Sequence, residues 1–394
     1  MISCARFANA EVANGPVRMD EKLTAESIIE YFARVPDPRD ERTREHPLSS
    51  ILALALLAVI SGADSFVAIE LYGECQEEFL RTFIDLPKGI PSHDTIGRVF
   101  AALNPNALQE AFRDWIADVA QVTQGQVVAI DGKTLRRSFR HADNKAFVHM
   151  VSAWATQNRI VLGQVKTEEK SNEITAIPRL LKLLQLKGST VTIDAMGCQK
   201  EIADEIVKAE ADYVLAVKDN QPKLHSDITA LFNRAATNAD FLDTLDFCES
   251  TSKGHGRVEV RRCWTCTDLD SISKRKEWSN LACVALVEVD RTADGKTSTE
   301  QRYYISSKKH LRSKSALSIV RSHWGIENEL HWVLDVAFRE DDCRVRAGYA
   351  AENFAVVRHI AFNLLKKAKS KVGIKNRRLR AALDRQFMLQ LLCG

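Results

Sequence analysis

Long hydrophobic runs are absent from this sequence of 394 residues. The most apolar stretch, residues 51–60, is about half as long as a membrane-spanning helix requires, and it therefore predicts a buried helix. Residues 1–25 read as a polar leader without the basic start and long apolar stretch of a secretory signal. We expect a cytoplasmic protein with no membrane partner.

Cysteines are few and odd in number: the sequence has nine, scattered from Cys4 to Cys393. This distribution favours reduced thiols in a cytosolic protein over a disulfide framework. Cys263 and Cys266 have the spacing of a metal-binding pair, but no second Cys or His pair follows at finger-like spacing. We interpret them as two cysteines on a strand.

Neither sign of charge dominates, because 55 Lys and Arg face 52 Asp and Glu, a formal net charge of +3. Affinity for nucleic acid would therefore have to come from local clusters of basic residues. One such cluster is the segment 366–380, which is rich in Lys and Arg and contains no acid. It fits a solvated tail or a nucleic-acid contact equally well.

Changes in residue pattern divide the chain. Turn signals between apolar helices predict an all-α N-terminal domain, and three consecutive strands followed by alternating helix and strand predict a mixed sheet with helices on its faces. A block of strands then interrupts this α/β core. The predicted segments are a leader at 1–25, a helical domain at 26–122, the first part of the core at 123–233, a β-rich insertion at 234–308, the second part of the core at 309–370, and a basic tail at 371–394.

The segment Val127-Val-Ala-Ile-Asp-Gly-Lys133 predicts a short apolar strand that ends at Asp131. The following Gly-Lys-Thr resembles the end of a P-loop, but that motif requires glycine where Val127 stands. The segment Thr190-Val-Thr-Ile-Asp-Ala-Met196 repeats the arrangement with Asp194. A carboxylate at the end of a buried strand is costly unless something binds it, so two of them favour a shared divalent metal over two turn caps.

A third acid lies in His323-Trp-Gly-Ile-Glu-Asn328, on a predicted helix. His323, Glu327 and His331 recur every four residues beside an apolar stripe, which places Glu327 at the margin of the core. The same spacing would permit zinc, but the order differs from the paired-His helix of metalloproteases, and a salt-bridged helix surface is the simpler interpretation. Helical periodicity alone leaves Glu327 and Glu329 both open as the functional acid.

Basic residues accompany these motifs. The segment Lys253-Gly-His-Gly-Arg257 and the strand after it favour either phosphate contact or an exposed hairpin. Our candidates for DNA contacts are Lys133, Arg136, Arg137, Lys218, His255, Arg257, Arg261 and His323.

Five segments together resemble bacterial insertion-sequence transposases of the DDE type, in the branch that includes the H-repeat-associated proteins of Rhs elements. These segments are Ala129-Ile-Asp-Gly-Lys-Thr-Leu-Arg-Arg-Ser138, Thr192-Ile-Asp-Ala-Met-Gly-Cys-Gln-Lys200, Tyr213-Val-Leu-Ala-Val-Lys-Asp-Asn-Gln221, Gly254-His-Gly-Arg257 and His323-Trp-Gly-Ile-Glu-Asn-Glu-Leu-His-Trp332. The resemblance implies a ribonuclease H-like core with catalytic, metal-binding Asp131, Asp194 and Glu327, and so selects Glu327 over Glu329. Many relatives carry Tyr, Arg and Lys where this chain has Val320, His323 and Leu334.

The function implied by the resemblance is cleavage at the ends of a mobile element and strand transfer into target DNA. It further implies Mg²⁺ as cofactor, with Mn²⁺ as a substitute, double-stranded DNA as partner, and a homodimer in the synaptic complex. Such a cytoplasmic protein would associate with the nucleoid when bound to DNA. The alternatives are a decayed or domesticated copy that only binds DNA, and a host ribonuclease H-like nuclease.

Overall fold

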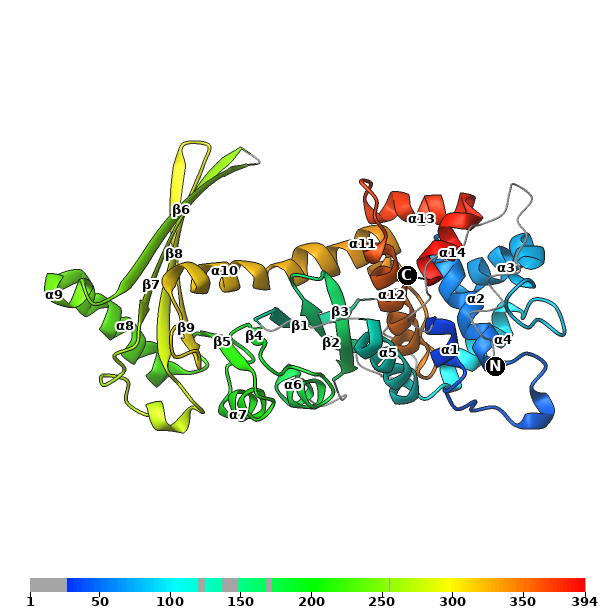
Figure 1. Ribbon diagram of the computed structural model, residues 1–394, viewed down its shortest axis with the longest axis horizontal. Helices are drawn as coiled ribbons and strands as arrows, with labels where there is room; N and C mark the ends of the chain where they lie inside the picture. Colours follow the sequence, from blue (N-terminus) through cyan, green and yellow to red (C-terminus); the bar gives the residue numbers. More distant parts are fainter. Residues whose placement is uncertain (1–26, 120–124, 137–147, 168–171, 255, 394) are drawn as a thin grey trace.

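The computed structural model describes residues 27–119, 125–136, 148–167, 172–254 and 256–393. The molecule is elongated, with an all-helical end, a central sheet and a pair of long β-hairpins arranged along its longest axis (Figure 1). The predicted leader and two candidates for DNA contacts, Arg137 and His255, lie outside the described residues. Within the described ranges, no helix is both long and apolar enough to cross a membrane.

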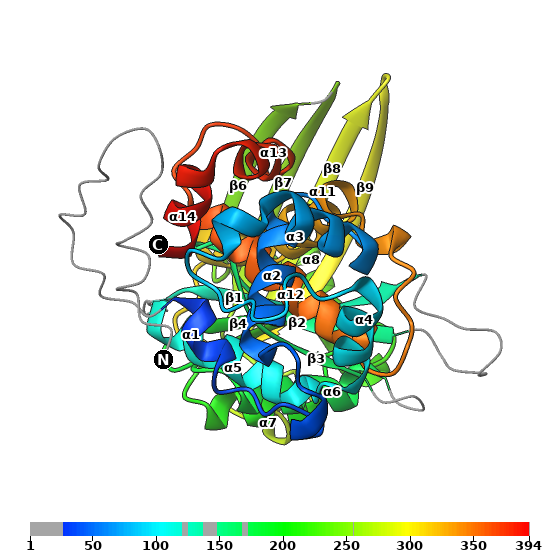
Figure 2. The same ribbon diagram turned by 90° about the vertical axis from the view of Figure 1, so that its right-hand side faces the viewer.

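The helical end is built around one apolar helix. Its N-terminal elements are α1 (Ile28–Phe32), a 3-10 turn (Glu41–Thr43), α2 (Leu48–Ile60), α3 (Phe66–Leu80), α4 (His93–Ala102) and α5 (Pro105–Val119). Every residue of α2 except Ser49 is buried, which confirms the prediction of a central helix. Figure 2 shows α2 behind α3 and beside α12 (Ala350–Lys367).

The central sheet begins with an antiparallel meander and continues with parallel crossovers. Its elements are β1 (Val127–Leu135), β2 (Val148–Ala155), β3 (Ile160–Lys166), α6 (Glu173–Lys182), β4 (Thr190–Ile193), α7 (Lys200–Lys208) and β5 (Asp212–Val217). Strand β4 runs parallel to β1 and to β5, with α6 and α7 as the connecting helices. The predicted mixed α/β class is therefore confirmed.

The β-rich segment extends this sheet. After α8 (Pro222–Thr237) and α9 (Ala239–Leu242) come β6 (Asp246–Gly254), β7 (Arg257–Cys266), a 3-10 turn (Arg275–Glu277), β8 (Cys283–Ala293) and β9 (Lys296–Ser306). Because β9 pairs with β5, one nine-stranded sheet results, in the order β3-β2-β1-β4-β5-β9-β8-β7-β6. Cys263 and Cys266 are buried free thiols on β7, as predicted.

The chain then returns along the sheet to the helical end. The elements are α10 (Ser313–His323), a π-helix (Ile326–His331), α11 (Trp332–Phe338), a 3-10 turn (Glu340–Asp342), α12, α13 (Ile374–Leu383) and α14 (Arg385–Cys393). The Asn363 side chain on α12 accepts from the Val161 amide and donates to the Val161 carbonyl, both at 2.8 Å. These bonds fasten α12 to β3.

The predicted basic tail is folded. Arg378, on α13, is buried and donates to the carbonyl oxygens of Val59 and Ala337 and to Asp64. Arg377 donates to carbonyls at the end of α12 and in the loop after it, including that of Leu365 at 2.7 Å. These guanidiniums stabilise helix ends, so the segment is packed as helices, while most of its lysines are exposed and their contact with nucleic acid stays a prediction.

Candidate active site

Strand register brings Asp131 and Asp194 together. Ile130 on β1 pairs with Ile193 on β4, so the two residues that follow lie at the same level of strands about 4.8 Å apart. Asp194 follows the last residue of β4, as predicted. The prediction that Asp131 ends its strand is wrong, because β1 continues to Leu135 by pairing with β2 after β4 has stopped.

Asp131 lies among other carboxylates. Burial raises its pKa to about 7, the acids Glu173, Asp194 and Glu327 add to the rise, and a hydrogen bond from the Gly132 amide opposes it. His331 Nδ1 lies 3.5 Å from Asp131 Oδ2, but burial lowers the pKa of His331 to about 3, so its ring is neutral. These carboxylates form an acidic cluster that would gain from a cation.

Asp194 is held by the loop that follows it. One of its oxygens, Oδ1, accepts hydrogen bonds from the Met196 amide at 3.0 Å and the Gly197 amide at 3.3 Å. Burial raises the pKa of Asp194, and these amides oppose the rise. Asn220 and Gln221 donate to carbonyls of the same loop, at 2.6 and 2.9 Å, which gives the Lys-Asp-Asn-Gln segment a role in fixing the site.

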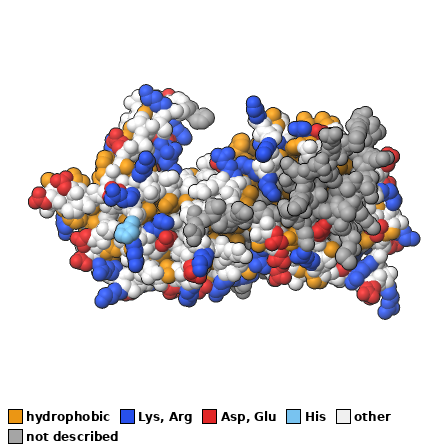
Figure 3. All heavy atoms as spheres, in the orientation of Figure 1, with side chains coloured by type: hydrophobic (Ala, Val, Ile, Leu, Met, Phe, Trp, Pro, Cys, Tyr) orange, Lys and Arg blue, Asp and Glu red, His pale blue; other side chains and the backbone are white. Residues whose placement is uncertain are grey.

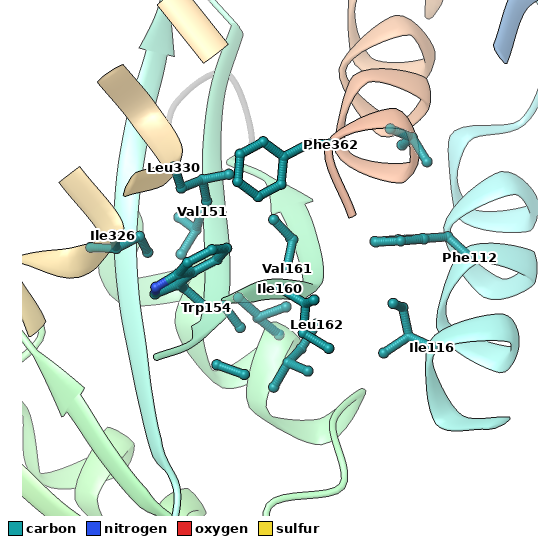
Figure 4. Close-up of a cluster of buried hydrophobic side chains, with 14 of the residues drawn as sticks. Phe112, Ile116, Val151, Trp154, Ile160, Val161, Leu162, Ile326, Leu330 and Phe362 are labelled. Atoms are coloured by element: carbon teal, nitrogen blue, oxygen red, sulfur yellow. The ribbon is translucent and has the colours of Figure 1, made fainter. Parts of the chain in front are cut away.

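Glu327 lies on the π-helix, whereas periodicity predicted a regular helix. Segments of this kind are frequent at functional sites. Ile326 and Leu330 are fully buried and face Trp154 beside Phe362, as Figure 4 shows. Between these two buried residues Glu327 is exposed, and its side chain has no hydrogen bond or ion pair with another described residue.

Glu329 differs from Glu327 in its partners. Its Oε2 lies 3.1 Å from Arg159 Nε and 3.8 Å from Lys366 Nζ. Because two cations already neutralise Glu329, Glu327 is the acid with a charge available to a ligand. This contrast agrees with the choice that the family resemblance made.

The ring of His323 contacts a neighbouring strand. His323 Nδ1 lies 3.0 Å from Thr192 Oγ1, and burial lowers the pKa of His323 to about 4. Nowhere in the described part of the chain do three His, Cys, Asp or Glu side chains converge closely enough to hold a metal ion. The zinc interpretation therefore gains no support, and the role of His323 in DNA binding stays a prediction.

Lys133 is buried in an ionic network on the face of β1 toward α11. Its ammonium contacts Asp335 and lies 2.8 Å from Glu340 Oε2, while Arg358 lies 3.7 Å from the other oxygen of Glu340. Burial opposes ionisation of Glu340, but Lys133 and Arg358 outweigh it and lower its pKa to about 2. These contacts argue against the predicted role of Lys133 in phosphate binding.

Other candidates for DNA contacts are more accessible. Lys218 is exposed and close enough to Asp194 to lower its pKa. Arg136 is exposed and lies 3.2 Å from Asp341. On β7, Arg257 is half exposed, whereas Arg261 is largely buried and pairs with Glu259. Their roles remain predictions.

Glu173 is an acidic neighbour of the site that the sequence analysis missed. It is the first residue of α6, and its Oε1 lies 2.7 Å from His149 Nε2. Among charged groups it contributes most to the raised pKa of both Asp131 and Asp194. An acid in the first turn of a helix is common, so only tertiary structure singles it out.

The donor chemistry of this cluster fits a hard divalent cation. Asp131, Asp194 and Glu327 offer carboxylate oxygens, the ligands that Mg²⁺ prefers, although among the described residues no three such side chains converge closely enough to hold an ion in this arrangement. The pKa of Asp131 is raised first by burial and then by the neighbouring acids, and a bound cation would offset both effects.

Comparison with known proteins identifies the class. Residues 123–364 match the family model described as Transposase DDE domain, and residues 29–116 match the model described as DDE_Tnp_1-associated. The chain therefore belongs to the DDE transposase family.

Its similarity to curated relatives extends over nearly the whole chain. It is 42% identical to the "H repeat-associated putative transposase YhhI" and to the "Putative protein YbfL" of Escherichia coli K12, over 94% of this chain and 99% of each relative. It is also 42% identical to the "Putative transposase YncI" of Escherichia coli O157:H7, over 94% of this chain and 96% of that protein. The resemblance to the H-repeat-associated branch is confirmed.

Proposed function

We propose that this protein is a DNA transposase that cleaves the ends of an insertion sequence and joins them to target DNA, with Asp131, Asp194 and Glu327 as its catalytic, metal-binding residues. The observation that carries the proposal is the register of β1 and β4, which puts two carboxylates side by side and within electrostatic reach of the third. The proposal requires the Glu327 carboxylate to move nearer to the other two when substrate binds, so that all three can bind the same metal ions.

A ribonuclease H-like core is part of this proposal. Three antiparallel strands followed by two parallel ones, with Asp131 on the first and Asp194 after the fourth, agree with the order expected from the family. Glu327 comes from a late helical segment that packs against β2, again in the expected order.

In the proposed mechanism the protein supplies ligands and orientation. Bound Mg²⁺ ions, or Mn²⁺ in their place, would polarise the scissile phosphate and favour a nucleophilic water or 3′-hydroxyl. Asp131 and Asp194 present oxygens from neighbouring strands, while Glu327 presents its charge from the π-helix, whose His331 lies beside Asp131. Neutral His331 at 3.5 Å from Asp131 leaves the charge of that carboxylate available.

Double-stranded DNA is the proposed partner, and a homodimer is the proposed form in the synaptic complex. Lys and Arg side chains line the long hairpins in the face shown in Figure 3. On β7 and β8, Arg257, Arg261 and Arg291 surround the single acid Glu259, so this group keeps a positive net charge. Such a surface suits contacts to the phosphate backbone.

The decisive experiment replaces Asp131 with asparagine and measures cleavage and strand transfer on DNA that carries the element ends. We expect both rates to fall about 100-fold or more, because several kcal/mol of transition-state charge stabilisation is lost. Asp114→Asn, at an exposed position on α5, is the control and should retain both activities. Wild-type rates in Asp131→Asn would refute the assignment.

The same assay separates the alternatives. A host nuclease would cut without joining the 3′ end to a second DNA molecule. A copy that only binds DNA would do neither, although its affinity for DNA would persist.

A further inference from the structure

Strand β6 forms one edge of the nine-stranded sheet, and no other described strand pairs with its outer side. It has nine residues, contains no proline, and pairs with β7 without a shift of register. Its outward amide and carbonyl groups therefore form a regular row that no described strand uses. Proteins usually shorten, interrupt or cover such an edge, because it is a template for pairing with another chain.

The edge at the other end of the sheet, β3, is protected. The Asn363 side chain on α12 accepts from the amide of Val161 and donates to its carbonyl, both at 2.8 Å. A side chain that satisfies both backbone groups of an edge residue blocks the approach of a further strand. The hairpin of β6 and β7 instead projects beyond α10, as Figure 1 shows.

The sequence of β6 is complementary to itself in the antiparallel direction. When two copies pair about a two-fold axis at Thr251, Glu249 of each copy lies opposite Lys253 of the other. Alternation along the strand puts these three residues on one face of the sheet, and all three are exposed, Glu249 by 46%. Two opposite-charge pairs then lie directly across the junction, where such pairs stabilise a sheet.

The contacts within one copy leave this face available. Arg262 pairs with Glu249, but it also pairs with Glu288 at 3.0 Å and with Asp290 at 2.6 Å. Arg262 therefore keeps two carboxylates when Glu249 turns toward a second copy. Cys248 packs in the apolar cluster beneath α10, so α10 covers the other face of β6.

We propose that two copies of this protein associate through β6, by antiparallel pairing about Thr251 that joins their sheets into one. The partner is a second copy because the strand supplies both members of each charge pair. This inference rests on the proposed homodimer and adds its interface. The pairing involves neither DNA nor the catalytic acids.

The test is sedimentation velocity of the full-length protein without DNA, at micromolar concentrations. Glu249→Lys puts like charges opposite one another at both pairs, and so does Lys253→Glu. Each variant alone should raise the dissociation constant of the dimer at least about 10-fold. An equimolar mixture of the two variants restores both opposite-charge pairs and should dimerise as the wild type does. Lys187→Glu, an exposed charge reversal outside β6, is the matched control with an unchanged dimer.

A cysteine at the two-fold axis reports the register of the pairing. Two Thr251→Cys side chains would face one another at a distance that a disulfide can bridge, so mild oxidation should link the dimer covalently. Ser298→Cys, at an exposed position on β9, is the control for background from the native cysteines. It should give no more linked dimer than the wild type.

Three results would overturn the inference. The first is a monomeric wild type in which Thr251→Cys links no more than Ser298→Cys. The second is a dimer that persists in both single charge variants, and the third is a mixture of them that stays monomeric. Should a single variant lose its cooperative unfolding transition, Glu249→Lys combined with Lys253→Glu replaces it, and this double variant must dimerise with itself. Each overturning result would leave the proposed cleavage and strand transfer standing, because that chemistry is tested separately on DNA that carries the element ends.

Discussion

Replacing Lys133 with methionine is expected to destabilise the fold and to leave the affinity for DNA unchanged. The Lys133 side chain is 11% exposed and its partner Glu340 is 2% exposed, so the pair is buried. Removal of one partner of a buried pair leaves an uncompensated charge and costs about 3–5 kcal/mol. Arg358, at 3.7 Å from Glu340, would compensate only in part. The loss is large beside a typical unfolding free energy of about 5–15 kcal/mol.

Urea unfolding at pH 7 measures this loss directly. Lys187→Met is the control, since Lys187 is exposed and its pair with Glu210 should contribute about 1 kcal/mol or less. In the double variant Lys133→Met with Glu340→Gln, the buried charge is gone and part of the lost stability should return.

The free energy of unfolding should also depend on pH in a defined direction. The folded-state pKa of Glu340 is lowered to about 2 from its ordinary value of 4.5, so its contribution is present above about pH 4.5 and is lost as the pH falls toward 2. The difference between wild type and Lys133→Met should therefore narrow in acid. A loss under about 1 kcal/mol at pH 7, together with a salt slope of DNA binding reduced by about one, would show that Lys133 contacts phosphate instead.

Three further predictions concern residues of different roles. Because the pKa of half-buried His323 is lowered to about 4, the protein should lose about 2 kcal/mol as the pH falls from 7 to 5, and His323→Gln should remove that loss in urea unfolding at the two pH values. Asn363→Ala removes both bonds to the Val161 backbone and should cost about 2–4 kcal/mol in the same assay. Arg257→Ala should weaken DNA binding and lower the salt slope by about one without changing stability, and an unchanged slope would exclude a phosphate contact.

The residue pattern was sufficient for local structure. Apolar β-branched runs predicted β1, β4 and β5, and the uniformly apolar composition of α2 predicted its central position. The extent of β1 could not be predicted in this way, because residues after Ile130 remain in the strand only through pairing with β2. The π-helix at Glu327 could not be predicted either, because an argument from helical periodicity assumes regular α-helical turns.

The partners of charged residues were even harder to predict from the sequence. The sequence placed Lys133 among the DNA contacts because a basic residue beside a candidate catalytic acid suits phosphate. Its partners Asp335 and Glu340, some two hundred residues away, lie beside it only in the folded chain. The electrostatic role of an ionisable group is set by its burial and neighbours, and local sequence specifies neither.

By itself, the sequence determined the kinds of elements, the two strand-borne acids and, through five motifs, the transposase family. Only the tertiary structure decided that β1 and β4 bring Asp131 and Asp194 side by side. It also decided that the Glu329 carboxylate is paired with cations while the Glu327 carboxylate has no ion pair with a described residue, and that Glu173 lies near the other acids. The physical reason is that strand register and helix packing are long-range pairings. Their geometry depends on contacts between segments that no local pattern records.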